Sequence, residues 1–301
     1  MIKTGSTWLQ DHVFLAPDSV RPSTGFHCAA PAARAHLVDR IVLRGGFAFD
    51  PAAGAAYFRG LQVNKAGSVP VWSDETMLGD PLTRRYDGPS SLEKLKACFP
   101  DARVLMVIRE QRSIALSMFN QYVKEGGALT ATDFFGTGDE PLSFSPILRA
   151  DFLEYDRAIS KLHELFGPEN CLVMPQELLR RSPGDFLARL AAFCEVEAAA
   201  LVDAAESNRA PPQATQAMRR RLNRLFVASP LQPAAANRGR RWLLRGTAII
   251  GSCIPAYLHR AMRRRLEAQI RARFEGAYGP SNRRAQELTG IDLSAFDYDL
   301  V

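Results

Sequence analysis

Residues 102–110, "ARVLMVIRE", constrain the fold more than any other stretch of this sequence, because they contain five consecutive apolar side chains. A strand that is covered on both faces needs apolar side chains at every position, as the strands of parallel sheets do. Further short apolar runs occur at 68–75 and 171–174, and helical patterns separate them. This alternation predicts an α/β fold with a parallel sheet, flanking helices and right-handed crossovers.

Start and stop signals predict where several helices lie. In "SSLEKLKACF" at 90–99, Ser90 or Ser91 is expected as the N-cap, with Glu93 in the position that completes a capping box. The helix after the main apolar run should end at the glycine pair 126–127. "SPGDFLARLAAFCEV" at 182–196 predicts an amphipathic helix that begins at a proline.

The 301 residues are enough for one large domain with a sizeable core. We expect a single domain over 1–301, with an α/β nucleotide-binding core at 1–208 and a largely helical, arginine-rich subregion at 209–301. Between residues 209 and 273 there are 15 arginines, no lysine and one acid, a net charge of +14 that leaves −8 for the remaining chain. Such a block favours an anionic partner, although solvated helix faces are an equally good explanation.

The cysteines and the apolar stretches bear on the protein's location. The five cysteines are dispersed, without a CxxC pair or a histidine at ligand spacing, which indicates reduced thiols and no metal site. No signal-peptide apolar region follows Lys3, so we expect a cytoplasmic protein. "WLLRGTAIIGSCIPAYL" at 242–258 has only 17 residues and includes Arg245 and Pro255, too short for a membrane span. A buried helix is favoured there over a helix that lies on an anionic membrane surface.

The opening segment "KTGSTWLQ" at 3–10 has the composition of a phosphate-binding loop. Such a loop needs a glycine for close approach, backbone N–H groups that point at the anion, and a helix behind it. A helix is expected here, with Leu9, Val13 and Phe14 facing inward. The lysine precedes the glycine, so the Walker A pattern is absent, and no strand ends in an aspartate that would hold magnesium. A kinase or GTPase is therefore disfavoured.

A second anion site is predicted by "VIREQRSIALS". Arg109 ends the buried strand, and Ser117 follows eight residues later on the next helix. A guanidinium and a hydroxyl group beyond a strand end can bind an oxyanion. Two separate phosphate sites imply a nucleotide that is phosphorylated at two places.

Together, "KTGSTWLQ" and "VIREQRSIALS" closely resemble the sulfotransferases that use 3′-phosphoadenosine-5′-phosphosulfate (PAPS), in particular the bacterial carbohydrate type. The segments 171–196 and 278–300 resemble this family more loosely. The resemblance implies a P-loop-like parallel sheet and assigns the 3′-phosphate to Arg109 and Ser117. It assigns the 5′-phosphosulfate to a set of loop residues: Lys3, Thr4, Gly5, Ser6 and Thr7. Trp8 would stack on the adenine, or would equally well be a core residue of the first helix.

Two departures from the family pattern stand out. The family normally has a strand and a proline just before its lysine, whereas Ile2 occupies the proline position here. We therefore expect that the natural chain begins upstream of Met1; the alternative is a member that lacks its first strand. In addition, the family's Phe-Leu-Gly helix ending is replaced by "FCEV" at 193–196.

The chemistry that the resemblance implies is an in-line sulfuryl transfer without a metal. Lys3 would stabilise the leaving phosphate oxygen. The base that takes the acceptor's proton is expected in "VWSDE", and Glu75 is favoured because related members use a glutamate in a comparable place. The alternatives are helix capping by Asp74 and Glu75, and a histidine as the base, for which the sequence offers His12, His27 and His36.

The acceptor is expected to be a hydroxyl group of a saccharide, glycoconjugate or small metabolite, with peripheral membrane contact as an option. Arg209 would contact the 3′-phosphate or lie on the surface. The competing hypotheses are a non-catalytic nucleotide-binding protein and a nucleic-acid-binding protein that uses the basic segment 209–273. No specific nucleic-acid partner is expected, because this segment has few interleaved aromatic residues and no recognised DNA-binding motif.

Overall fold

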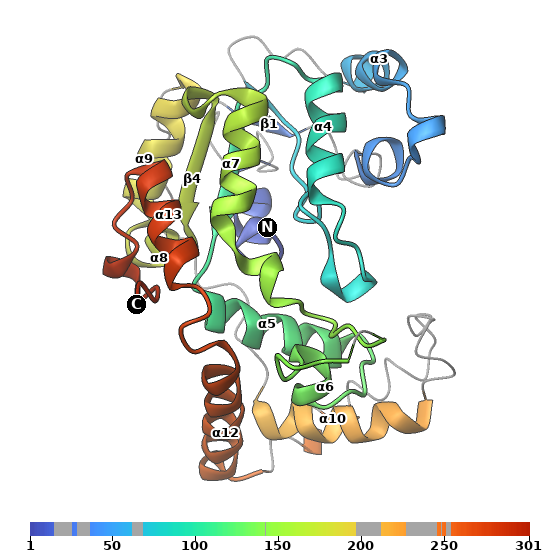
Figure 1. Ribbon diagram of the computed structural model, residues 1–301, viewed down its shortest axis with the longest axis vertical. Helices are drawn as coiled ribbons and strands as arrows, with labels where there is room; N and C mark the ends of the chain where they lie inside the picture. The colour runs from blue at the N-terminus through green and yellow to red at the C-terminus, as the bar shows by residue number, and fades with distance from the viewer. Residues whose placement is uncertain are drawn as a thin grey trace.

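The computed structural model describes residues 1–14, 26–28, 37–61, 69–141, 143–196, 212–226, 246–247, 249–250 and 254–301 (Figure 1). All structural statements below concern these residues.

Four short strands lie in the described part of the chain. Strand β1 (Phe26–Cys28) pairs in parallel with β2 (Val69–Val71), and β3 (Val104–Ile108) pairs in parallel with β4 (Cys171–Pro175). They form two separate two-stranded sheets. The α/β fold and the parallel pairing predicted from the sequence are confirmed. The described residues do not form one continuous sheet.

Helices make up most of the remaining described structure. The α-helices are α1 (Ser6–Leu9), α3 (Pro51–Leu61), α4 (Gly88–Cys98), α5 (Gln111–Lys124), α6 (Ala131–Phe135), α7 (Tyr155–Phe166), α8 (Gln176–Arg181), α9 (Pro183–Cys194), α10 (Gln213–Phe226), α12 (Ala256–Phe274) and α13 (Gly279–Thr289). The short 3₁₀ and π segments are η1 (Gln10–Phe14), η2 (Val38–Val42), η3 (Gly46–Ala48), η4 (Pro81–Thr83), η5 (Ala150–Leu153), η6 (Pro168–Asn170) and η7 (Ser294–Phe296).

Strand β3 separates two hydrophobic cores, because successive side chains of a strand point to opposite faces. Met106 and Ile108 belong to the larger core, which α4, α5, α7 and α13 complete. Val107 lies in the second core together with Leu9 of α1 and Phe186 of α9. This burial on both faces is what the unbroken apolar run requires, and it fixes the carboxyl end of β3 inside the molecule.

The junction between β3 and α5 is held by the side chain of Glu110. Its carboxylate accepts hydrogen bonds from the backbone N–H groups of Arg112 and Ser113 at 2.9 and 2.8 Å. A side chain that caps the first turn in this way satisfies donors that have no partner within the helix. The chain therefore turns directly from strand to helix at Arg109.

The start of α4 differs from the prediction. The helix begins at Gly88 with Pro89 in its first turn, and Asp87 occupies the N-cap position. Ser91 is already inside the helix, where its backbone N–H donates to the carbonyl of Asp87 at 2.9 Å. Glu93 pairs with Lys161 at 3.0 Å and completes no capping box. Pro89 explains the earlier start, since proline is favoured in the first helical turn.

The first helix also differs, because α1 has four residues and continues as the π-helical segment η1. The inward orientation predicted for Leu9, Val13 and Phe14 is confirmed, since all three side chains are buried.

The arginine-rich subregion is helical where it is described. Helices α10 and α12 pack against α5, and α12 also contacts α6, so this subregion extends the larger core at the lower end of the molecule (Figure 1). None of the described helices has a stretch apolar and long enough to cross a membrane.

Candidate functional site

Three segments that are distant in sequence meet at the loop that precedes α1. The guanidinium of Arg109 donates to the backbone carbonyl of Lys3 at 3.1 Å. The hydroxyl of Ser6 donates to the carboxylate of Glu75 at 2.5 Å. The ammonium of Lys3 donates to the side-chain carbonyl of Gln121 on α5 at 3.1 Å. The predicted loop, the predicted base and the residue at the end of β3 are therefore brought together.

The loop has an unusual backbone. Lys3 and Gly5 both lie in the left-handed region, with φ of 62° and 89°. For a lysine this conformation is uncommon, and such strained residues are concentrated at functional sites. A Cβ atom at position 5 would lie 3.3 Å from the Leu179 side chain and 3.4 Å from that of Gln176, so glycine also allows the close packing of the loop on α8. The first backbone N–H groups of α1 have no acceptor within that helix and border this loop.

The hydroxyl residues of the loop have different environments. Thr4 is buried, and its hydroxyl donates to the carbonyl of Met1 at 2.7 Å. Ser6 is half-buried against Glu75, and Thr7 is exposed. Of the two threonines predicted to bind phosphate, only Thr7 is open to a ligand through its side chain.

Lys3 carries its charge in a half-buried position. Burial lowers the pKa of its ammonium group, and the nearby carboxylate of Glu75 partly offsets this effect. Lys124 and Arg109, which are also positive, lower the pKa of Lys3 further. An anion bound beside Lys3 would stabilise the charged form and raise this pKa again.

Arg109 is fixed by its neighbours on both sides. Its own carbonyl accepts a hydrogen bond from the hydroxyl of Tyr155 at 2.5 Å. Burial lowers the pKa of the guanidinium, while the charge of Glu177 raises it. The side chain is thus a partly desolvated cation at the end of β3, as the sequence predicted.

Ser117 lies on α5, one helical turn before Gln121. Residues four positions apart share a helix face, so Ser117 is on the face that carries the contact to Lys3. Its side chain is half-buried, and within the described residues its hydroxyl has no hydrogen-bond partner.

Among the candidates for the base, Glu75 has the strongest connection to the loop. Its neighbour Asp74 accepts from both the backbone N–H and the hydroxyl of Thr76 at 2.6 Å. Residues 75–78 form a turn and not a helix, so the helix-capping alternative is wrong. The imidazole of His12 lies 5.2 Å from the ring of Trp8, centre to centre. The side chain of His27, and His36 as a whole, lie outside the described residues, as does Arg209.

Trp8 is half-buried against the second core and in contact with His12. Core packing accounts for part of the ring, and adenine stacking stays a prediction.

Sequence reasoning missed two residues at the start of α8, one against the loop and one near Arg109. Gln176 packs against Gly5, and within the described part of the chain its buried side-chain oxygen has no hydrogen-bond partner. Glu177 accepts from the backbone N–H of Glu110 at 3.1 Å and from the hydroxyl of Tyr298 at 3.3 Å, and burial raises its pKa. The signal was their position directly after a buried strand, where parallel sheets place their ligand-contacting residues.

The arrangement is suited to anion binding. Two partly buried cations meet here, Lys3 within the loop and Arg109 bonded to its backbone, and the carboxylate of Glu75 accepts from Ser6 beside them. In the described part of the chain, no group of three or more histidine, cysteine, aspartate or glutamate residues is arranged to hold a metal ion.

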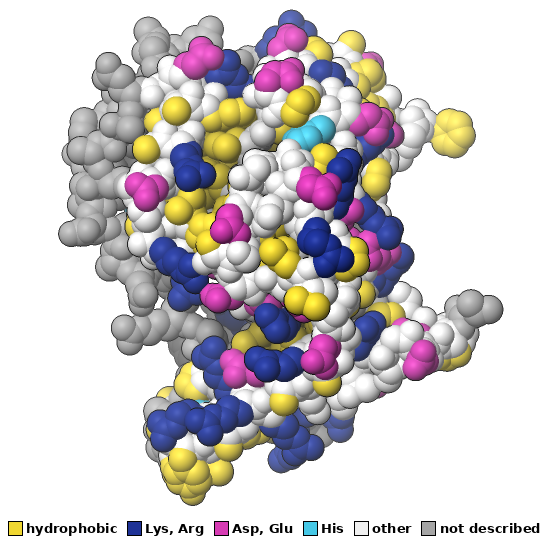
Figure 2. Space-filling model, turned by 60° about the vertical axis from the view of Figure 1, so that its left-hand side comes forward, with side chains coloured by type: hydrophobic (Ala, Val, Ile, Leu, Met, Phe, Trp, Pro, Cys, Tyr) yellow, Lys and Arg dark blue, Asp and Glu magenta, His cyan; other side chains and the backbone are white. Residues whose placement is uncertain are grey.

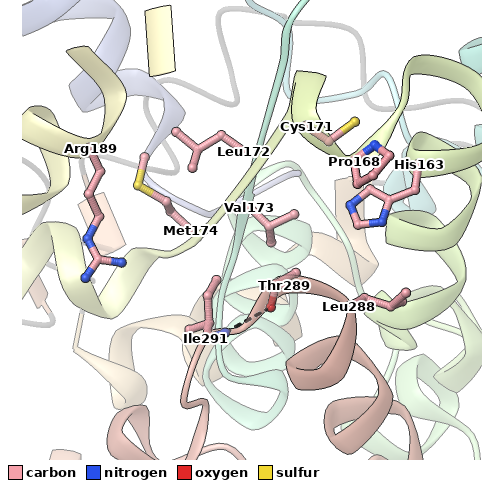
Figure 3. Close-up of a pocket in the computed structure, with 10 residues that line it drawn as sticks. All are labelled: His163, Pro168, Cys171, Leu172, Val173, Met174, Arg189, Leu288, Thr289 and Ile291. Carbon is pink, nitrogen blue, oxygen red and sulfur yellow. Dashed lines mark hydrogen bonds between the residues drawn. The ribbon is translucent and has the colours of Figure 1, made fainter. Parts of the chain in front are cut away.

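A separate hollow runs along the outer side of β4, between α7, α9 and the end of α13 (Figure 3). Cys171, Leu172, Val173 and Met174 form its floor, with His163 and Arg189 at its borders. None of the predicted site residues lines it, and its lining includes the polar side chains of His163, Arg189 and Thr289. The predicted site residues therefore gather at the loop before α1 and not at this hollow.

Comparisons with models of protein families, with curated proteins and with solved structures found no match to this chain.

Proposed function

We propose that this protein binds PAPS and transfers its sulfuryl group to a hydroxyl group of an acceptor. The observation that carries the proposal is the convergence of Lys3, Glu75 and Arg109, which come from three separate segments, at one loop. A cation for the leaving group, a carboxylate for the acceptor and a guanidinium for a second phosphate are the groups that this reaction needs. We also propose that the parallel α/β fold is P-loop-like.

In the proposed reaction the acceptor oxygen attacks the sulfur atom in line with the bridging oxygen of the 5′-phosphosulfate. A new oxygen–sulfur bond forms while the bond between sulfur and the bridging oxygen breaks. Glu75 takes the proton of the acceptor hydroxyl. The electron pair of the broken bond stays on the 5′-phosphate of the product, 3′,5′-adenosine bisphosphate, and Lys3 stabilises the charge that develops there.

Arg109 and Ser117 are proposed to bind the 3′-phosphate. A planar guanidinium forms strong charge-assisted hydrogen bonds with phosphate oxygens, and Arg109 is already partly desolvated. Ser117 adds a hydroxyl group on the face of α5 that carries Gln121. The proposed acceptor is a saccharide, a glycoconjugate or a small metabolite in the cytoplasm.

The experiment that tests the proposal is the Glu75→Gln variant. Glutamine keeps an oxygen that can accept from Ser6 but cannot take a proton, so the rate of PAPS turnover with an accepted hydroxyl compound should fall by about 10²–10⁴-fold. Binding of 3′,5′-adenosine bisphosphate should be unchanged. The matched control is Glu93→Gln, which removes a carboxylate outside the site. An unchanged turnover in Glu75→Gln would rule out Glu75 as the base.

A further inference from the structure

The first half of α12 is exposed on nearly all sides, although it is rich in apolar residues. Tyr257, Leu258 and Met262 are 62%, 41% and 39% exposed. Ile249 and Ile250, shortly before the helix, are 69% and 54% exposed. These five are the majority of the nine exposed large apolar side chains in the described residues, and they lie within 14 residues of the sequence. Exposed apolar side chains gathered in this way mark an interaction surface.

The second half of the same helix is anchored in the protein. Leu266, Ile270 and Phe274 are buried in the larger core, where α12 packs against α5 and α6. The first half therefore continues beyond this core at the lower end of the molecule, where α10 touches one side of it through the bond from the Ala214 N–H to His259 at 3.2 Å (Figure 1). Its exposure is a property of the folded arrangement and not of a frayed end.

Arginines surround the exposed apolar residues. Arg260, Arg264 and Arg265 are exposed, and none of them has an ion-pair partner among the described residues. Arg263 is the exception, since it pairs with Glu267 at 2.7 Å. Figure 2 shows hydrophobic side chains at the lower tip of the molecule with dark blue Lys and Arg side chains directly beside them. The surface thus combines a positive field with apolar side chains.

This combination distinguishes between anionic partners. A nucleic acid or a polyanionic glycan would engage the arginines but would leave the leucine, methionine and isoleucine side chains in water. A bilayer that contains anionic lipids takes both, because the headgroups attract arginines and the interface accepts apolar and tyrosine side chains.

We propose that the first half of α12, residues 256–265, together with Ile249 and Ile250, docks this protein onto the surface of anionic bilayers. Tyr257, Leu258 and Met262 enter the interface, and Arg260, Arg264 and Arg265 contact lipid phosphates. Binding is peripheral. It depends on exposure and charge alone and is independent of the proposed sulfuryl transfer. Within the stretch 242–258, where a buried helix was expected, Thr247 is buried and bonded to Arg219, but Ile249, Ile250, Tyr257 and Leu258 are exposed.

The test is co-sedimentation of the full chain with phosphatidylcholine vesicles and with vesicles that also contain phosphatidylserine. We expect binding to the anionic vesicles only. The double variant Arg264→Ala/Arg265→Ala should bind them about tenfold or more weakly. Leu258→Ser/Met262→Ser, which keeps every charge, should also lose most of the binding.

Matched controls lie at the opposite end of the molecule, near α3. Arg44→Ala/Arg59→Ala removes the same charge from exposed positions, and Phe47→Ser removes a fully exposed aromatic side chain. Both should bind anionic vesicles like the unmodified protein, and all variants should unfold at the same temperature, since every altered side chain is exposed.

Two results would overturn the proposal. One is the absence of binding to anionic vesicles by the unmodified protein. The other is vesicle binding that Leu258→Ser/Met262→Ser leaves intact while Arg264→Ala/Arg265→Ala abolishes retention of duplex DNA. That second pattern would assign this surface to nucleic acid.

Discussion

Lys3 carries a positive charge in a half-buried position. Its ammonium group donates to the side-chain carbonyl of Gln121 and lies near the carboxylate of Glu75. In the folded protein its charged form is disfavoured by burial, so the charge adds little to stability. Under the proposed function, its role is to bind the phosphosulfate anion. Activity and stability should therefore respond differently when this side chain is changed.

The Lys3→Met variant tests this separation. We expect turnover of PAPS to be abolished, whereas the free energy of unfolding should change by less than about 1 kcal/mol, since one hydrogen bond is lost and one desolvated charge is removed. Turnover and urea unfolding are measured on the same preparation. Lys161→Ala, which removes a lysine bonded to exposed glutamates, is the control and should stay active. Full activity of Lys3→Met would remove Lys3 from the mechanism.

Arg109 is expected to contribute affinity for the 3′-phosphate. In Arg109→Ala the binding of 3′,5′-adenosine bisphosphate should weaken by about 2–4 kcal/mol, because one or two charge-assisted hydrogen bonds are lost. Binding of 5′-AMP reports on the loop, since the same guanidinium also holds the carbonyl of Lys3. Calorimetric titration of both nucleotides separates the two roles. A parallel loss for the two nucleotides would mean that Arg109 only positions the loop.

At the scale of the elements, Glu177 links α8 to the β3–α5 junction and to the C-terminal tail. Its carboxylate accepts hydrogen bonds from Glu110 and Tyr298, yet burial raises its pKa above the ordinary glutamate value of 4.5. A group whose pKa is raised on folding binds more protons in the folded state. Stability is therefore lost as the pH rises from about 4.5 through the raised pKa, where the buried carboxyl must ionise.

The Glu177→Gln variant removes this titration and keeps an acceptor oxygen. Relative to the unmodified protein, its free energy of unfolding should increase as the pH is raised from 4 to 7, at about 1.4 kcal/mol per unit of pKa shift. Urea unfolding at several pH values measures the difference. A difference that is constant with pH would show that Glu177 titrates normally in the folded state.

At the scale of the whole molecule, the sequence predicts the elements better than their assembly. The apolar run at 104–108 and the patterns of α5, α7 and α9 were sufficient to predict strand and helices, because burial on one or both faces determines periodicity. Pairing into two sheets depends on contacts between distant strands, and no local pattern encodes it. The start of α4 at Gly88 was missed because a proline in the first turn outweighed the serines that follow.

The same contrast holds for the candidate site: residues in local motifs were predicted, and contacts between distant segments were not. Lys3, Gly5 and Arg109 were predicted because they belong to motifs with a fixed local geometry. Gln121 was not, because its contact to the loop arises from the packing of α5 and leaves no mark in the sequence near it. Gln176 was missed although it directly follows a buried strand, because that position does not show which loop it packs against. Glu75 was predicted as a residue, but its bond to Ser6 across 69 positions is known only from the structure.

Calorimetric titration of the full chain with 3′,5′-adenosine bisphosphate, with 5′-AMP in parallel, tests the central claim most directly. We predict micromolar binding of the bisphosphate. Binding of 5′-AMP should be weaker by about 2–4 kcal/mol, since it has no 3′-phosphate to contact Arg109 and Ser117. Equal affinity for the two nucleotides would contradict a second phosphate site, and the absence of binding by either would contradict the proposed function as a whole.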